Sequence, residues 1–128
     1  MLSKVKTYKI KTINLNKGKI IKLLNKKEKF FKGFGECYLN EVKKNNVKGW
    51  NYHKKNTCII YPISGKFLFT FTSNFKNKKT ITIDKNKLKL ILIPPKTWFK
   101  FKSLSNNAVL MNIINNVHYD NELKKKII

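Results

Sequence analysis

The pattern of apolar and polar positions along the chain indicates a series of short β-strands. Residues 36–42 alternate polar and apolar side chains, which suits a strand with one buried face. Later segments are rich in β-branched and aromatic residues and are separated by turn-forming residues such as Ser64-Gly65-Lys66. These further predicted strands are residues 47–53, 57–63, 67–72, 80–83, 89–93, 97–101 and 108–114. Short, evenly spaced strands of this kind predict an all-β fold, either a sandwich or a barrel.

Helical periodicity is weak throughout the chain. Residues 18–31 could hold one helical turn around Lys26-Lys27-Glu28 and residues 121–128 another, but neither segment repeats apolar residues with a period of 3.6. We find no internal repeat and no linker. The sequence therefore predicts a single domain over residues 1–128.

The apolar segments are too short for a membrane protein. None approaches the roughly 20 residues that a bilayer-spanning helix needs, and the basic start of the chain lacks the apolar core of a signal peptide. Two cysteines, Cys37 and Cys58, are too few for the disulfide framework of a small secreted domain, so we expect both to be reduced. We therefore expect a cytoplasmic protein with no membrane partner.

The strongly basic composition does not by itself indicate a nucleic-acid partner. The formal net charge is +23, and all 29 basic residues are lysine. Asparagine, isoleucine and phenylalanine are also common, and these residues share A/T-rich codons with lysine, so compositional drift explains the charge. Specific nucleic-acid binders usually use arginine for bidentate contacts. We expect no specific nucleic-acid partner, only weak, salt-sensitive adhesion to polyanions.

Several motifs in order give the chain a resemblance to a known family. They are residues 30–38, 47–57, 64–66 and 93–101. Their order and spacing resemble the short form of the dTDP-4-dehydrorhamnose 3,5-epimerase family over about residues 18–122. The resemblance implies a cupin-type jelly-roll β-barrel, or double-stranded β-helix, that forms a homodimer without a cofactor. It also implies a nucleotide-activated sugar as ligand and a role in polysaccharide or glycoconjugate biosynthesis.

The resemblance also shows where this chain departs from the family's chemistry. The motif whose histidine removes a proton beside a keto group falls on residues 48–51, so the base position is Asn51. The position of the family's tyrosine acid falls on Asn112, and a second histidine position falls on Phe99. An amide does not titrate near neutral pH and cannot act as a general base or acid.

Other residues could replace the missing groups. His53 lies two positions after Asn51 and therefore on the same side of a strand, where it is either a substitute base, a sugar contact or a structural histidine. Glu36 is an alternative base. The resemblance implies substrate-binding positions at Lys48, which could meet a phosphate, at Glu36 and Tyr38, which could line the barrel, and at Phe99. Trp50 and Tyr52 are expected to face away from the barrel interior, and His118 is expected on the surface.

Metal binding is not expected at the positions that metal-binding cupins use. Those positions fall on Asn51, His53, Cys58 and Phe99, and this set offers too few ligands for a stable site. Two functions then remain open. One is a nucleotide-sugar epimerase or isomerase acting through proton removal beside a carbonyl, and the other is a non-catalytic cupin that binds a sugar nucleotide or supports a partner enzyme.

Overall fold

The computed structural model describes residues 2–118 and 122–126, and its regular structure is β-strand apart from two short 3-10 turns, η1 (Leu2–Lys4) and η2 (Lys85–Lys87). One five-stranded antiparallel sheet has the order β1 (Lys6–Lys9), β9 (Lys89–Ile93), β6 (Cys58–Ser64), β11 (Ala108–Ile114), β4 (Glu36–Val42). The other has the order β12 (Leu123–Lys125), β5 (Val47–His53), β10 (Trp98–Ser103), β7 (Lys66–Thr72), β8 (Lys78–Asp84). A separate hairpin pairs β2 (Lys11–Leu15) with β3 (Gly18–Lys22).

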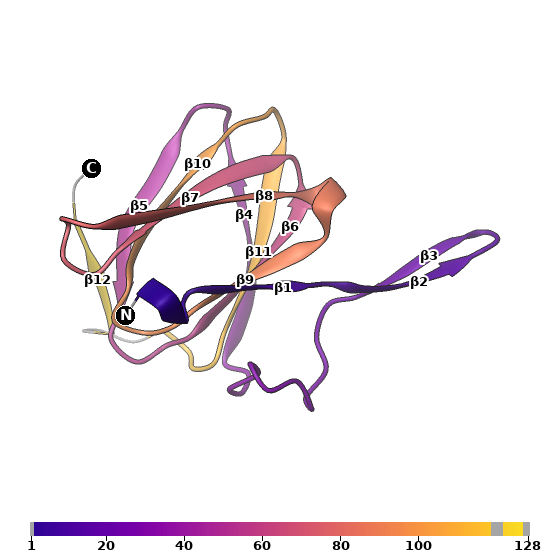
Figure 1. Ribbon diagram of the computed structural model, residues 1–128, viewed down its shortest axis with the longest axis horizontal. Helices are drawn as coiled ribbons and strands as arrows, with labels where there is room; N and C mark the ends of the chain where they lie inside the picture. The colour runs from indigo at the N-terminus through magenta and orange to yellow at the C-terminus, as the bar shows by residue number, and fades with distance from the viewer. Residues whose placement is uncertain (1, 119–121, 127–128) are drawn as a thin grey trace.

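The two large sheets face each other (Figure 1), and apolar side chains from both form the core between them. Strand β7 explains how the sequence builds this core, because Phe67, Phe69 and Phe71 occupy every second position and are fully buried. Phe99 and Phe101 of the neighbouring strand β10 add two more buried rings. The predicted all-β, cupin-type jelly roll is confirmed.

A tight turn between β6 and β7 sets the register of that part of the barrel. Gly65 has a φ of +73°, and a Cβ there would lie 2.9 Å from the Cα of Ala108. Only glycine avoids both the backbone strain and the clash. The turn predicted at Ser64-Gly65-Lys66 is therefore confirmed.

Neither expected helical turn is a helix in the structure: residues 25–31 form non-helical turns, and the described part of the second segment, residues 122–126, holds a strand. Residues 18–22 form β3, which pairs with β2 through directly opposed residues such as Ile13 and Ile20. Residues 123–125 form β12, which pairs with the end of β5. Cross-strand pairing outweighs local propensity in both places. Strands β1 and β2 were also not predicted from the sequence.

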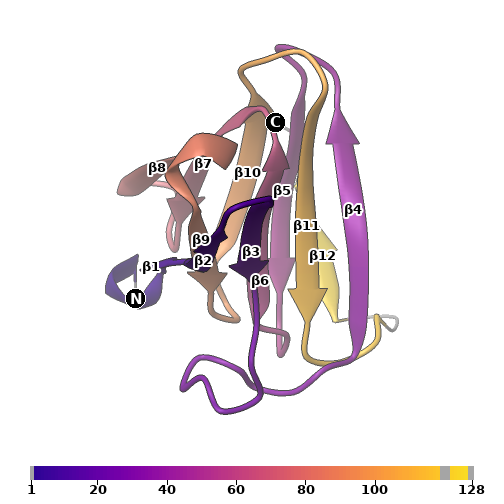
Figure 2. The same ribbon diagram turned by 90° about the vertical axis from the view of Figure 1, so that its right-hand side faces the viewer.

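The β2–β3 hairpin is an arm. Figure 1 shows it extending away from the two sheets, and in Figure 2 it points towards the viewer. Ile13 and Ile20 face each other on one side of the hairpin, together with Leu15, and all three side chains are exposed. An isolated two-stranded hairpin is marginally stable in water.

Within the described part of the chain, no helix is long and apolar enough to cross a lipid bilayer. Both cysteines are free thiols, as expected: Cys37 is exposed and Cys58 is buried. Burial raises the pKa of the Cys58 thiol to about 12, so it behaves as a small apolar side chain.

Candidate functional site

A glycine in β5 orients the residues of the site. Gly49 has a φ of +114°, and a Cβ there would lie 2.7 Å from the backbone oxygen of Phe99. The pairing of β5 with β10 shifts register at this point, where Asn51 lies opposite Phe99 but Gly49 lies opposite Lys100. Beyond this bulge the strand alternates regularly, so Asn51 and His53 point to the same side.

A cavity of about 490 Å³ opens between the two sheets at this side of β5. Most of the residues singled out from the sequence line it. They are Lys48, Asn51 and His53 of β5, Tyr38 of β4, Phe99 of β10 and Asn112 of β11. The structure thus brings together side chains from both sheets, including Asn51 and Asn112.

The rings of Trp50 and Tyr52 lie on the opposite side of β5, and neither lines the cavity. Trp50 packs edge-on against Phe75 at a ring-centroid distance of 5.3 Å. The ammonium group of Lys100 lies 4.8 Å from the centre of the Trp50 ring. The expectation that these two aromatic residues face away from the barrel interior is therefore confirmed.

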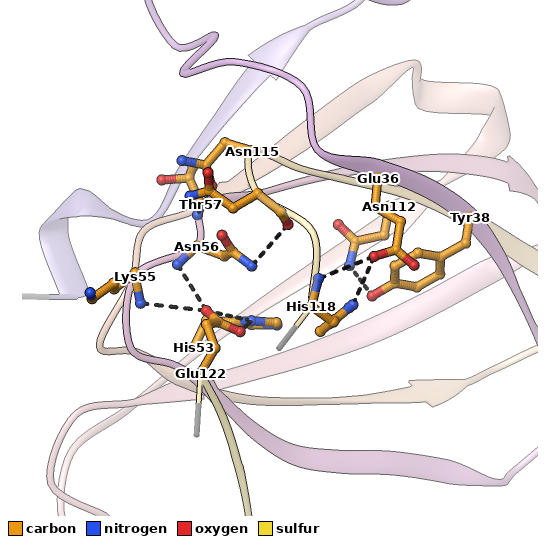
Figure 3. Close-up of polar contacts among 11 residues, drawn as sticks. Glu36, Tyr38, His53, Lys55, Asn56, Thr57, Asn112, Asn115, His118 and Glu122 are labelled. Atoms are coloured by element: carbon orange, nitrogen blue, oxygen red, sulfur yellow. Dashed lines mark hydrogen bonds and ion pairs between the residues drawn. The ribbon is translucent and has the colours of Figure 1, made fainter. Parts of the chain in front are cut away.

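His53 is held by a carboxylate that sequence reasoning missed. Its Nδ1 lies 2.8 Å from Oε2 of Glu122, and both side chains are almost completely buried (Figure 3). The other carboxylate oxygen, Oε1, accepts a hydrogen bond of 2.9 Å from the backbone N–H of Asn56. Nδ1 is thereby occupied, and Nε2 is the ring nitrogen left to meet a ligand in the cavity.

The protonation states of this pair follow from its surroundings. Burial lowers the pKa of His53, although the hydrogen bond and the negative charge of Glu122 act in the opposite direction. Burial acts to raise the pKa of Glu122, but hydrogen bonds from His53 and the backbone of Asn56 outweigh it and bring the pKa below its usual value. At neutral pH the pair is therefore a neutral imidazole hydrogen-bonded to a carboxylate, which is the form that a general base requires.

The phenol of Tyr38 lies beside the amide of Asn112, the residue at the predicted acid position. Asn112 pairs directly with Tyr38 across β11 and β4, and its Nδ2 donates a hydrogen bond of 2.9 Å to the Tyr38 hydroxyl oxygen. Burial raises the pKa of Tyr38 to about 12. The hydroxyl therefore keeps its proton at neutral pH and can donate it. Oδ1 of Asn112 is buried and has no hydrogen-bond partner within residues 2–118 and 122–126.

The expectation that His118 is a surface residue is wrong. His118 is half-buried and lines the cavity, where its ring centre lies 5.6 Å from that of His53. Its Nδ1 lies 3.2 Å from Oε2 of Glu36. Glu36 itself does not line the cavity, and its carboxylate is engaged by His118. It is therefore poorly placed to act as a base.

No local signal in the sequence points to Glu122 or to His118. Glu122 precedes the three-residue strand β12 and reaches the site because Leu123 pairs with His53 across β12 and β5. That pairing joins distant parts of the chain, and β12 is too short to show an alternation of apolar and polar residues in the sequence. His118 lies in the irregular segment that follows β11.

The fold and the site define a cupin-type protein with a ligand-sized cavity between two antiparallel sheets and a buried histidine–carboxylate pair in its wall. A family model described as "FdtA: WxcM-like, C-terminal" matches residues 3–124. The chain therefore belongs to this family.

Solved structures with the same fold include enzymes that act on nucleotide sugars. A dTDP sugar isomerase from Desulfovibrio desulfuricans G20 has a TM-score of 0.88 and 20% identity, over 97% of this chain and 84% of that one. QdtA, a sugar 3,4-ketoisomerase from Thermoanaerobacterium thermosaccharolyticum solved in complex with TDP, has a TM-score of 0.86 and 19% identity, over 98% and 90%. ChmJ, a 3'-monoepimerase from Streptomyces bikiniensis solved with dTDP-quinovose, has a TM-score of 0.83 and 9% identity, over 94% and 68%. A search of the curated proteins gives no match.

Proposed function

We propose that the protein is a nucleotide-sugar isomerase that moves protons beside the keto group of a nucleoside-diphosphate sugar, in polysaccharide or glycoconjugate biosynthesis. The observation that carries this proposal is the His53–Glu122 pair, with Nδ1 bound to the carboxylate at 2.8 Å and Nε2 left for substrate. The predicted base position, Asn51, carries no proton acceptor of suitable pKa. His53, two residues further along the same face of β5, takes that role.

The reaction needs no cofactor, because it only redistributes protons within the sugar. In a 4-keto sugar, Nε2 of His53 removes the proton on C3, and the electron pair of that C–H bond forms an enolate whose oxygen is at C4. The C4 oxygen gains a proton, the C3 hydroxyl loses one, and C4 is protonated, which gives the isomeric 3-keto sugar. The Tyr38 hydroxyl, which retains its proton at neutral pH, is the donor we assign to the C4 oxygen.

Charged and polar groups around the cavity fit the remainder of such a substrate. Lys48 and Lys125 line the cavity and provide positive charge for a diphosphate. The unpartnered Oδ1 of Asn112 can accept a hydrogen bond from a sugar hydroxyl. The QdtA and ChmJ structures, solved with TDP and dTDP-quinovose, support thymidine as the nucleoside.

A non-catalytic role is the second candidate. Amides at Asn51 and Asn112 stand where the 3,5-epimerases are expected to carry a base and an acid, and they favour a protein that binds a sugar nucleotide or supports a partner enzyme of the pathway. The presence of a neutral, carboxylate-bound histidine in the same cavity favours the enzyme.

We further propose that the protein is a cytoplasmic homodimer. The apolar face formed by Ile13, Leu15 and Ile20 projects on a hairpin that does not pack against either large sheet, and a second copy of the chain is the partner that would cover it. The two free thiols suit a reducing compartment.

Product analysis tests the proposed activity. The protein would be incubated with dTDP-4-keto-6-deoxyglucose in deuterated water, and the sugar would be followed by NMR. We expect deuterium to enter the ring and the ketone to move from C4 to C3. A protein that binds the nucleotide sugar in a thermal-shift assay but exchanges no carbon-bound proton would establish the non-catalytic function instead.

A further inference from the structure

Two histidines and a glutamate converge in the wall of the cavity. His53, His118 and Glu122 each offer one ligand atom, and these atoms all lie within 4.8 Å of one another (Figure 3). They come from the end of β5, from the segment after β11 and from the residue before β12. Neither His118 nor Glu122 is among the positions that metal-binding cupins use. The fold therefore assembles a ligand set that no local motif contains.

Neighbouring residues hold the side chains of this cluster in place, as the hydrogen-bond partners of metal ligands do in metal sites. Nδ1 of His118 lies 3.2 Å from Oε2 of Glu36, which leaves Nε2 of His118 as its free ligand nitrogen. Oε1 of Glu122 accepts from the backbone N–H of Asn56 at 2.9 Å, which fixes the carboxylate. Metal-bound histidines commonly have a carboxylate or a carbonyl on their second nitrogen, because that contact fixes the ring and raises its basicity.

The charge of the cluster also favours a cation. Glu122 is a buried carboxylate whose Oε2 lies 2.8 Å from Nδ1 of His53. Among the described residues, no lysine forms an ion pair with Glu122, despite 29 lysines in the chain. The carboxylate therefore has hydrogen-bond donors but no cationic side chain beside it, and a bound metal ion would supply the opposite charge.

We propose that His53, His118 and Glu122 bind one late first-row divalent metal ion such as Zn²⁺. Two imidazoles and one carboxylate suit this class, whereas Mg²⁺ prefers oxygen ligands only. Ligand atoms in a tetrahedral zinc site lie about 3.4 Å apart, given metal–ligand distances of about 2.1 Å. The three ligand atoms lie within 4.8 Å of one another, so a small shift of the half-buried His118 ring towards Glu122 would close the site.

Metal binding has a consequence for the proposed reaction, although the site itself does not depend on that function. Because Glu122 lies against Nδ1 of His53, a metal held by both residues takes the place of the Nδ1 hydrogen, and the ring then carries its hydrogen on Nε2. This removes the lone pair assigned to the base, so the metal-loaded protein is expected to be inactive in proton exchange.

Direct titration with zinc alone tests the site without reference to activity. Isothermal titration calorimetry of the full chain with Zn²⁺ is expected to give one equivalent bound, with no binding of Mg²⁺. His118→Gln should weaken zinc binding by at least about 100-fold, because losing a direct ligand costs more than the roughly 10–100-fold lost with an outer partner. The matched control is Cys37→Ser, which removes the exposed thiol that could bind zinc adventitiously and should leave the affinity unchanged.

An NMR readout covers the case in which His118→Gln fails to fold. The chain has two histidines, so the ring nitrogen signals of His53 and His118 can be assigned in the wild-type protein and followed as zinc is added. Both sets should shift together at one equivalent. Absence of binding at about 100 μM zinc, binding abolished by Cys37→Ser, or ring signals that do not move would overturn the proposal.

Discussion

Tyr38 and Asn112 are directly paired across strands β4 and β11, and the amide Nδ2 of Asn112 donates a hydrogen bond of 2.9 Å to the Tyr38 hydroxyl oxygen. Asn112 stands at the position where the resemblance predicts a tyrosine acid. The structure places a phenol next to that position, on the neighbouring strand. Because the amide donates to the phenol oxygen, the proton of the phenol remains free to be donated to a ligand.

Tyr38→Phe is therefore expected to lower kcat for isomerisation by about 100-fold or more, the usual contribution of a positioned acid. Binding of TDP should change little, because the ring remains. The matched control is Tyr52→Phe, which alters a ring on the outer side of β5 and should leave kcat unchanged. Steady-state kinetics of both variants provide the measurement. Equal rates for Tyr38→Phe and the wild type would remove Tyr38 from the mechanism.

Gly49 is expected to be essential for the shape of the site. In Gly49→Ala the new Cβ would meet the backbone of β10 at 2.7 Å, and the φ of +114° would be strained as well. Strain of this kind costs about 1–3 kcal/mol, and the clash adds to it, so the free energy of unfolding should fall by at least about 2 kcal/mol. Gly18→Ala is the control, since its φ is +150° but no atom lies within 4 Å of the added Cβ. Urea denaturation that gives equal losses for both variants would contradict the assignment.

The exposed face of the β2–β3 hairpin is expected to hold two copies of the chain together. The double variant Ile13→Lys/Ile20→Lys places two charges on this face and should convert the dimer into a monomer. Asn14→Lys adds a charge on the opposite face of the hairpin and should leave the dimer intact. Light scattering coupled to size-exclusion chromatography measures both masses. A wild-type protein that is monomeric at micromolar concentration would show the dimer proposal to be wrong.

Acidification is expected to destabilise the protein through His53. Its pKa in the folded chain lies below the usual value of 6.5, so as the pH falls from 7 towards 5 the unfolded chain takes up a proton before the folded one does. Stability therefore declines over this range, by at most about 1.4 kcal/mol per pH unit for one group. Glu122, with a pKa lowered from 4.5, adds a second loss at lower pH for the same reason.

The variant His53→Gln isolates this effect, because it removes the His53 imidazole and leaves His118 in place in both proteins. Urea denaturation at pH 7, 6 and 5 should show a smaller decline for the variant than for the wild type. A wild-type stability that rises on acidification, or an identical decline in both proteins, would contradict the lowered pKa of His53.

The strands that carry the core could be predicted because their pattern is local. Alternating phenylalanines identify β7 directly, and the period of two along β5 correctly places Asn51 and His53 on one face. The hairpin β2–β3 was missed because its residues are exposed on both faces and leave no alternation to detect.

The partner of His53 could not be predicted for a different reason. Glu122 is 69 residues away from His53 in the chain, and only the pairing of the short strand β12 with β5 brings the two together. His118 likewise reaches the cavity through the course of an irregular segment. Residues that depend on long-range pairing of short elements carry no signal in the surrounding sequence.

The most direct test of the central claim is the rate at which wild-type protein and His53→Gln exchange the proton on C3 of dTDP-4-keto-6-deoxyglucose with deuterated water. If His53 is the base, the wild type exchanges this proton, and the variant loses at least about 100-fold in rate while still binding TDP. Equal exchange by both proteins, each correctly folded by circular dichroism, would contradict the role of His53.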